Sequence, residues 1–386
     1  MKVLFTMTNA FNPNAGGVQR TTYKLGKHFT ENGYDVFYYS TANNGHVTSN
    51  YGQLYHANNV GGVNNQQNIN QLCQILIKIN PNIVINQMPY EKKLRKTLFE
   101  YKTKLNYSLL GCLRNSLFSF KSNVNFIMKE TFPNFLYQIL NNNFGEFVVQ
   151  KWHFLKHRKE LRAIIDTHDR FILLAPPNKE ELDFFVGDYK SEKVISIPNS
   201  IPAIHKDTIT KEKIILHVGR LDLNQKRSDL LIKFWQEVCE DLIDWKFIIV
   251  GDGPYKSMLK KEIKDSKLPN IHLEGFQAPE KYYQAASIFM MPSAYEGFPN
   301  TILEAQSYGC IPFAFDSYGA LRWIVNDGKD AFLIEPFNTG GMAKRLVSLI
   351  KNDCIEEIRN SSFQNAEKFT VDKVGEHWFK LFKELI

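Results

Sequence analysis

The chain has 386 residues, of which 44% are hydrophobic. It is too long for one typical core and short for three, so two domains of similar size are expected. The longest apolar runs fall far short of the roughly 20 residues that a membrane-spanning helix needs. Five cysteines without a Cys-x-x-Cys pair argue against a disulfide framework and a zinc site, and favour the cytoplasm.

Charge is distributed unevenly along the chain. Residues 1–200 hold 23 Lys and Arg against 14 Asp and Glu, whereas residues 201–386 hold 24 against 26. The asymmetry predicts that the first half meets an anionic partner, with a membrane surface, an acidic substrate or a nucleic acid as candidates. The opening MKVLFTMTNAF lacks a small-residue cleavage pattern, so we interpret it as a strand rather than a signal peptide.

Short β-branched and aromatic runs alternate with stretches of helical periodicity, a pattern typical of parallel sheets covered by helices. The expected fold class is therefore α/β. In the first half, helices are expected over residues 18–32 and 91–104. Strands are expected at residues 3–8, 35–40, 82–86, 107–112, 170–175 and 194–197.

The second half repeats this pattern, with strands expected at residues 214–218, 247–250, 272–274, 288–291, 312–315 and 332–334. Between the halves lies SIPNSIPAIHKDTITKEK, whose prolines and weak apolar periodicity indicate a linker. We therefore expect domains at residues 1–200 and 201–370. A last helix at 371–386 carries Trp378, Phe379 and Phe382, which need a surface to cover.

The segment PSAYEGFPNTILEAQSYGCIP, residues 292–312, follows an apolar strand and holds Glu296 and Glu304 with seven residues between them. Pro299 suits the first turn of a helix. Free N–H groups at the start of that helix, beside Gly297 and Phe298, would suit a diphosphate. Glu304, about one turn further in, could accept hydrogen bonds from two neighbouring hydroxyls such as those of a ribose. Taken alone, either glutamate could equally be a solvated surface carboxylate.

A second segment, HVGRLDLNQKRSD, places Arg220 and Lys226 six residues apart after a strand, and Gly219 leaves room for close approach. Two such cations can neutralise a diphosphate leaving group as a divalent metal would. The sequence contains no Asp-x-Asp triplet, so an obvious metal-chelating element is missing. Alone, this pair of cations could also be a surface ion-pair site.

Together these elements resemble the retaining glycosyltransferases of the GT-B fold, family 4 (glycosyl transferases group 1), and in particular bacterial surface-polysaccharide enzymes. The resemblance is strong over residues 213–333. Besides the two segments above it includes VGDGP at 250–254, LEGF at 273–276 and AFDSYGALRWIVNDGKDAFLI further on. It implies two Rossmann-like, doubly wound parallel-sheet domains that face a cleft, with the last helix crossing back to the N-terminal domain through Trp378.

The resemblance also implies roles for particular residues. Arg220 and Lys226 would contact the donor diphosphate, Glu304 would bind ribose hydroxyls, and Glu296 would lie beside the transferred sugar. Glu296, Arg220 and Lys226 are thus the expected catalytic residues, and no metal or cofactor is expected. The other expected donor-binding residues are Gly16 and Gly17 of the NAGGVQR loop, Gly219, Phe276 and Gln277 near the base, Gly297, Phe298, Asn300, Thr301 and Glu304.

Two positions depart from the family pattern. Many relatives carry a histidine in the turn where this chain has Arg114, which leaves open the group that stabilises charge on the N-terminal side. Arg322 lies in a segment where an acidic residue is common, so the contacts to the donor sugar are expected to differ. The sequence identifies no general base.

The function implied is retaining transfer of a sugar from a nucleotide-diphosphate donor, with UDP the first choice, to a glycan or lipid-linked acceptor in bacterial surface-polysaccharide assembly. The alternatives are a sugar-nucleotide epimerase or hydrolase of the same fold, or a catalytically silent sugar-nucleotide-binding protein. Nucleic-acid binding would rest on charge alone, because the basic stretches lack a recognisable motif, so no nucleic-acid partner is expected.

Two basic stretches in the first half, EKKLRKTLFEYKTK from Glu91 and VQKWHFLKHRKELR from Val149, are candidates for contact with an anionic membrane. In the second, Trp152, Leu155 and Lys159 recur at helical spacing among basic residues, as in an interfacial helix. The alternative is a solvated helix face with an ordinary core stripe. From the sequence we therefore hypothesise that the basic N-terminal domain makes peripheral contact with the inner face of the plasma membrane.

Overall fold

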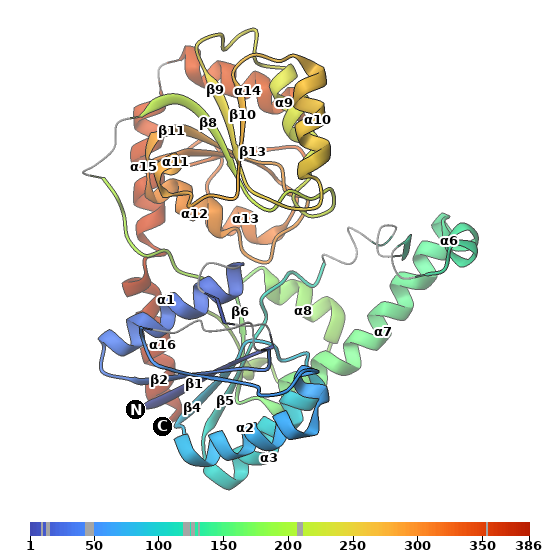
Figure 1. Ribbon diagram of the computed structural model, residues 1–386, viewed down its shortest axis with the longest axis vertical. Coiled ribbons are helices and arrows are strands. Elements are labelled where there is room, and N and C mark those ends of the chain that lie inside the picture. Colours follow the sequence, from blue (N-terminus) through green and yellow to red (C-terminus); the bar gives the residue numbers. More distant parts are fainter. Residues whose placement is uncertain are drawn as a thin grey trace. The chain divides into compact units, whose positions relative to one another are not determined.

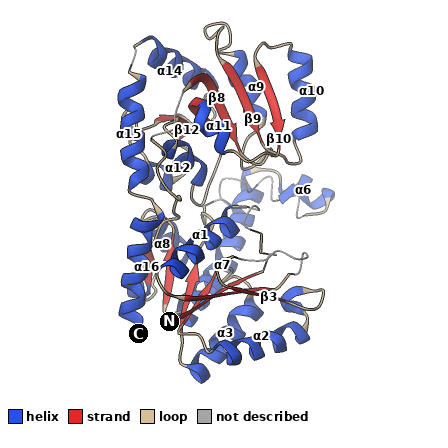
Figure 2. Cartoon of the chain, turned by 60° about the vertical axis from the view of Figure 1, so that its left-hand side comes forward, coloured by secondary structure: helices blue, strands red, loops and turns tan. Residues whose placement is uncertain are grey.

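The computed structural model describes residues 1–8, 11–12, 16–42, 50–118, 124, 128–129, 132–206, 211–352 and 354–386. The chain divides into two compact units. Unit 1 comprises Met1–Leu117, Phe135–Ser200 and Val371–Ile386, and unit 2 comprises Phe118–Asn134 and Ile201–Thr370. Each unit contains one parallel sheet with helices interleaved along the chain (Figures 1 and 2).

The sheet of unit 1 has seven strands in the order β3-β2-β1-β4-β5-β6-β7. All neighbouring strands pair in parallel. The strands are β1 (Lys2–Met7), β2 (Asp35–Ser40), β3 (Gln53–His56), β4 (Ile83–Asn86), β5 (Ser108–Cys112), β6 (Arg170–Leu173) and β7 (Val194–Ser196). The helices are α1 (Gly17–Glu31), α2 (Gln66–Ile79), α3 (Lys92–Leu105), α6 (Asn134–Leu140), α7 (Asn143–Thr167), α8 (Asn178–Val186) and α16 (Val371–Leu385).

Both faces of this sheet are buried. Val3 and Phe5 of β1 pack with α1 and α16 on one face, where Phe29 contacts Trp378 and Phe382. Leu4 joins the core formed with α2 and α3, the helices on the other side of the sheet (Figure 1). Parallel strands need such double burial, because their crossover helices cover both sides.

The sheet of unit 2 has six parallel strands in the order β10-β9-β8-β11-β12-β13. They are β8 (Glu212–Val218), β9 (Lys246–Val250), β10 (Ile271–Gly275), β11 (Ala286–Met291), β12 (Ile311–Phe315) and β13 (Phe332–Ile334). The helices are α9 (Asp229–Gln236), α10 (Lys256–Ser266), α11 (Glu280–Ala285), α12 (Asn300–Ser307), α13 (Gly319–Ile324), α14 (Thr339–Lys351) and α15 (Ile355–Glu367).

Both sheets follow the doubly wound order in which the first strand lies at the centre and the chain reverses direction after the third strand. The expected α/β class and the two Rossmann-like domains are therefore confirmed. Each expected strand overlaps an observed one, but β3 was not anticipated. Within the described residues, no helix is both long and apolar enough to cross a bilayer.

Candidate functional site

The candidate residues of unit 2 follow the carboxyl ends of its strands. In a parallel sheet these ends share one edge, and ligands bind where the order of the strands reverses. In unit 2 this point lies between β8 and β11, because β9 and β10 extend the sheet on one side and β12 and β13 on the other. The loops after β8 and β11 flank that point, and they carry Lys226 and Glu296.

Asp222 organises the loop between β8 and α9. Its carboxylate oxygen Oδ1 accepts hydrogen bonds from the backbone N–H groups of Asn224, Gln225 and Lys226 at 3.1, 2.8 and 3.1 Å. Its other oxygen accepts one from Nε of Arg220 at 3.1 Å. Asp222 is buried, whereas the Arg220 side chain is 67% exposed. The loop is thus held rigid from inside while the guanidinium remains accessible.

A buried ion pair joins the loops after β8 and β11. Lys226 Nζ lies 2.5 Å from Glu296 Oε1, and the two side chains are only 16% and 8% exposed. Gln225 Nε2 donates to the other Glu296 oxygen at 3.0 Å, and the Gln225 carbonyl accepts from the Ala294 N–H at 2.8 Å. Both oxygens of Glu296 are therefore occupied by donors from the other loop, which fixes the position of the lysine.

Glycines allow the neighbouring loops to approach each other. A Cβ on Gly251 would lie 1.9 Å from the carbonyl oxygen of Gly219, and one on Gly253 would lie 2.4 Å from that of Leu221. Gly253 also has φ +156°. The VGDGP segment at the end of β9 thus packs closely against the loop that carries Arg220. A side chain at either glycine would force the two backbones apart.

Buried polar groups that the sequence did not single out surround the pair. His217 donates from Nδ1 to the Met290 carbonyl at 3.0 Å, while its Nε2 has no hydrogen-bond partner. Burial, assisted by the Lys226 charge, lowers the pKa of His217 to about 4, so the ring is neutral near pH 7.

The hydroxyls of Ser293 and Tyr318 are likewise buried without a partner. Burial, with the charges of Glu296 and Asp316, raises the pKa of Tyr318 well above its ordinary value.

These groups differ in how far a sequence could reveal them. Asp222 precedes three N–H groups in a strand-to-helix loop, and this local pattern is typical of a carboxylate that bonds its own backbone. His217 and Tyr318 carry no local signal, because only the folded sheet brings them close to Lys226 and Glu296.

The start of α12 contains the remaining candidates on this loop. The helix begins at Asn300, with Pro299 directly before it; the expected first-turn position of Pro299 is therefore wrong by one residue. Gly297 is half-buried and Phe298 is buried before the helix. Thr301 lies in the first turn, and its hydroxyl donates to Met291 Sδ at 3.6 Å. Glu304 is buried one turn further along α12.

Other candidates of unit 2 lie at the same edge but are more exposed. Phe276, which is 70% exposed, and Gln277 follow β10. Arg322 of α13 forms an ion pair with Asp316, its Nε lying 2.8 Å from Oδ2. The positive charge at this unusual position is thus accompanied by a carboxylate from the end of β12.

In unit 1, Gly16 is exposed with φ +62° and precedes α1, whose first residue is Gly17. Residues 14 and 15, the first two of the NAGGVQR loop, lie outside the described part of the chain. Arg114 follows β5 and donates from Nε to Gln87 Oε1 at 2.6 Å and from Nη1 to Asn199 Oδ1 at 2.9 Å. Burial lowers the pKa of Arg114. Its partners are neutral amides rather than carboxylates.

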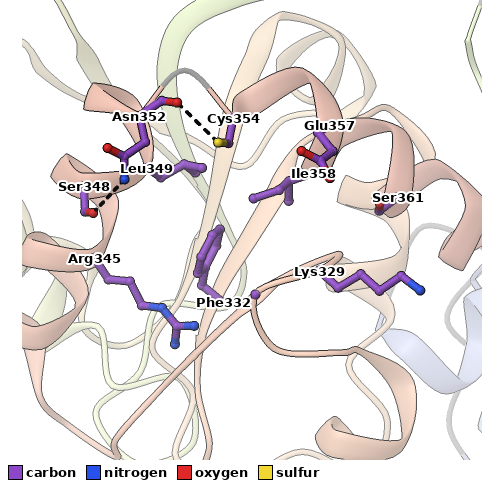
Figure 3. A pocket seen from close by; sticks show the side chains of 11 residues that line it. Lys329, Phe332, Arg345, Ser348, Leu349, Asn352, Cys354, Glu357, Ile358 and Ser361 are labelled. Atoms are coloured by element: carbon purple, nitrogen blue, oxygen red, sulfur yellow. Dashed lines mark hydrogen bonds between the residues drawn. The ribbon is translucent and has the colours of Figure 1, made fainter.

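Two further features of the described residues bear on the site. No three His, Cys, Asp or Glu side chains among them are grouped so as to hold a metal ion. A pocket of about 440 Å³ lies in unit 2, where Figure 3 shows the apolar side chains of Phe332, Leu349 and Ile358 among polar ones such as Arg345. None of the candidate site residues lines this pocket, so it is separate from the Lys226–Glu296 pair.

The sequence of unit 2 matches a known family. Residues 201–369 match the model of the family described as "Glycosyl transferases group 1", and this part of the chain is a domain of that family. With its two Rossmann-like domains, the chain has the GT-B fold.

The similar proteins comprise curated relatives and solved structures. An uncharacterized glycosyltransferase of Haemophilus influenzae is 30% identical over 224 residues, or 55% of this chain and 61% of that protein. The poly(ribitol-phosphate) alpha-N-acetylglucosaminyltransferase of Staphylococcus aureus is 31% identical over 253 residues, or 64% and 50%. The chain thus covers less than two thirds of either relative. HepE of Anabaena, solved with UDP and glucose, has a TM-score of 0.73 at 14% identity, with both chains fully covered.

Proposed function

We propose that the chain is a retaining, metal-independent glycosyltransferase that takes a sugar from a UDP-sugar and passes it to a glycan or lipid-linked acceptor. The supporting observation is the buried Lys226–Glu296 pair between the loops after β8 and β11, inside a domain of the glycosyl transferases group 1 family. The pair lies at the sheet edge where a doubly wound fold binds nucleotides.

The chemistry proposed is charge stabilisation of the departing diphosphate. Arg220 is accessible and anchored by Asp222, and Lys226 is held by Glu296; both cations are therefore in place before the reaction. Preorganised cations stabilise a developing negative charge most when they need no reorganisation. In a front-face mechanism the departing phosphate oxygen can itself accept the acceptor proton, so no separate base is required.

The remaining residues of this edge are proposed to hold the donor. Glu304 would accept hydrogen bonds from the ribose hydroxyls, and Phe276 and Gln277 would lie near the base. Gly219, Gly297, Phe298, Asn300 and Thr301 would approach the diphosphate, and Gly16 and Gly17 of unit 1 would approach the donor phosphates or the acceptor. UDP is favoured because similar folds, HepE among them, were solved with UDP.

The pathway proposed is the assembly of a bacterial cell-surface polysaccharide. Several relatives support it by their names, including an N-acetylgalactosaminyltransferase of Campylobacter jejuni that acts on a diphospho-undecaprenol-linked sugar. Such an acceptor would be reached at the inner face of the plasma membrane, and we propose a cytoplasmic location on that ground.

The proposal is tested by screening UDP- and other nucleotide sugars by thermal shift, since a bound ligand raises the melting temperature. Donors that bind are then incubated with and without candidate acceptors, with EDTA throughout, and the product anomer is assigned by NMR. Retained configuration in EDTA supports the proposal. Isomerised donor or rapid release of free sugar without an acceptor would indicate an epimerase or hydrolase. Binding without any turnover would indicate a silent binding protein.

A further inference from the structure

Helices α6 and α7 of unit 1 expose an unusual number of large apolar side chains. Phe135 and Ile139 of α6 and Phe144, Phe147 and Trp152 of α7 each expose more than half of their surface, as does Leu155. Figure 1 shows α7 leaving the body of the unit with α6 at its far end. Contiguous exposed apolar surface on a folded protein marks a place of interaction.

The two halves of α7 differ in what they contact. In the C-terminal half, Leu161, Ile164 and Ile165 are buried. The helix packs against α3, α8, β5 and β6, and its contact with α8 includes Phe154, whose ring meets those of Phe184 and Phe185. In the N-terminal half, Gly145 and Val149 are the buried residues. The helix is therefore anchored at one end and presents a free apolar face at the other.

The exposed side chains of the N-terminal half lie on one face. Steps of three and four residues separate Phe144, Phe147 or Val148, Lys151 or Trp152, and Leu155, and such steps place residues on the same side of a helix. Gly145 and Val149, the buried residues of this half, border that face beside Trp152. The stripe predicted from Trp152 and Leu155 is thus an exposed face here and not an ordinary core stripe.

The turn before α7 is well defined. Asn142 caps the helix by accepting from the Gly145 N–H at 2.9 Å, and a Cβ at Gly145 would lie 2.2 Å from the Leu140 carbonyl oxygen. The backbone of α6 therefore packs directly against the first turn of α7. Phe135 and Ile139, four residues apart, remain exposed on α6.

Basic side chains accompany the apolar face. Between Phe135 and Lys159 the chain has four Lys and Arg and a single acidic residue, Glu146. The ammonium group of Lys151 lies 5.8 Å from the Phe147 ring centre, and that of Lys156 lies 5.1 Å from the Trp152 ring centre. In a helix at a membrane interface, aromatic and aliphatic side chains enter the boundary of the acyl chains while long lysines reach the head groups.

We infer that the α6–α7 tip, residues 135–159, docks on a lipid bilayer that contains anionic lipids. A bilayer accepts a projecting apolar face without a matching pocket, and its negative surface complements Lys151, Lys156 and Lys159. A soluble polyanion would be attracted by the lysines alone and would leave the aromatic side chains in water. This inference does not rest on the proposed function, because no sugar nucleotide takes part in it.

The test is co-sedimentation of the full chain with vesicles of phosphatidylcholine alone or mixed with phosphatidylglycerol, at about 50 mM salt, where surface charges are weakly screened. One variant combines Phe144→Ser, Phe147→Ser and Trp152→Ser, and a second combines Lys151→Glu, Lys156→Glu and Lys159→Glu. We expect the chain to prefer the anionic vesicles, and each variant to bind them at least about tenfold more weakly. One lysine near such a surface contributes roughly fivefold, and one large apolar side chain that enters the bilayer contributes about 1.5 kcal/mol or more, roughly tenfold.

Matched controls separate the tip from general effects. Ile77→Ser, Ile243→Ser and Met258→Ser remove three exposed apolar side chains elsewhere. Lys92→Glu, Lys93→Glu and Lys104→Glu reverse three exposed charges on α3, the other basic stretch. Both controls should bind anionic vesicles within about twofold of the original chain, because neither alters the residues at the bilayer surface.

Four results would overturn the inference. The first is that the original chain does not sediment with anionic vesicles, and the second is that the α3 control loses as much binding as the tip variants. The third is that polyphosphate releases the chain while the serine variant binds vesicles normally, which would indicate a soluble polyanion. The fourth is that light scattering detects a dimer which the serine variant breaks without any change in vesicle binding, which would indicate contact between copies of the chain.

Discussion

The two units share one strand order but differ in what they place at the carboxyl edge of the sheet. In unit 2 the loops after the first and fourth strands bring together Lys226 and Glu296. In unit 1 the fourth strand ends in Asn86 and is followed by Gln87, both buried and neutral. Arg114 lies near them, held by amide oxygens. The same topology thus holds an ion pair in one unit and an arginine bound by neutral amides in the other.

The fold provides the position of a site, and the residues placed there provide its chemistry. A doubly wound sheet offers an edge where loops converge, in both units. Chemistry depends on the side chains placed there. In unit 2 Arg220 is accessible and Lys226 is held by a carboxylate, whereas Arg114 of unit 1 is half-buried and held by neutral amides. We therefore expect the donor site in unit 2.

The largest effect is expected from Lys226→Ala, which removes the cation held by Glu296. Transfer should fall at least a hundredfold, about 3 kcal/mol of transition-state stabilisation, as when one preorganised charged contact is lost. The measurement is kcat with the UDP-sugar identified by screening. Lys213→Ala, which removes an exposed ion pair with Asp244 in the same unit, is the control and should retain full activity.

The Lys226 variant also leaves Glu296 buried without its counter-charge, which destabilises the fold. Lys226→Ala combined with Glu296→Gln removes both charges and should recover the melting temperature but not the activity. Recovery of activity in the double variant would show that the cation has no role in transfer.

A second large effect is expected from Glu304→Ala. If this buried carboxylate binds the ribose, its loss should weaken UDP binding at least about tenfold, the order of one or two charge-assisted hydrogen bonds, and nearly abolish transfer at ordinary donor concentration. Isothermal titration with UDP provides the measurement. Glu240→Ala, at an exposed position of the same unit, should bind UDP normally; equal binding by both variants would remove Glu304 from the donor site.

The strands and the candidate loops of unit 2 could be predicted from the sequence because their signals are local. FIIV at 247–250 is an apolar run of strand length, and it forms the buried end of β9. By contrast QLYH forms β3, a four-residue edge strand with no fully buried residue, and offers no continuous apolar run. Edge strands are harder to predict because half of their surface remains in water.

The contacts of the candidate site could not be predicted in the same way. Glu296 and Lys226 are 70 residues apart in the chain, and the pairing of β8 with β11 is what brings their loops together. His217 and Tyr318 were missed because nothing near them in the chain indicates that their polar atoms would be buried without a partner. The sequence therefore reveals which charged residues follow a strand, whereas the residues that they contact depend on the order of the strands in the sheet.

A smaller effect is expected from Gly251→Ala, which tests the support of the Arg220 loop. The new Cβ would lie 1.9 Å from the Gly219 carbonyl oxygen, so the backbone must shift, at a cost of about 2 kcal/mol of unfolding free energy. Gly340→Ala is the matched control, because its Cβ would meet nothing closer than 3.8 Å and alanine favours the helix α14. The melting temperature should fall in the first variant and hold or rise in the second. Equal melting temperatures would show that the two loops are not tightly packed.

The smallest effect is a pH dependence shared by both units, since each contains a deeply buried histidine whose pKa is lowered. Burial lowers the pKa of His168 in unit 1 and of His217 in unit 2 to about 4, below the value of about 6.5 in an unfolded chain. Between these values the unfolded chain binds more protons, so stability is complete above about pH 6.5 and declines as the pH falls toward 4.

Each histidine should therefore cost about 1 kcal/mol of stability between pH 6 and 5. His168→Gln should flatten the fall in melting temperature of unit 1 alone, and His217→Gln that of unit 2 alone, when tryptophan fluorescence and calorimetry follow unfolding across this range. The replacement at 217 also changes a group whose charge would be felt by Lys226, so it should alter the acid limb of the activity profile, whereas the replacement at 168 should not. If both variants changed the acid limb equally, the buried histidine of unit 2 would have no closer connection to activity than that of unit 1.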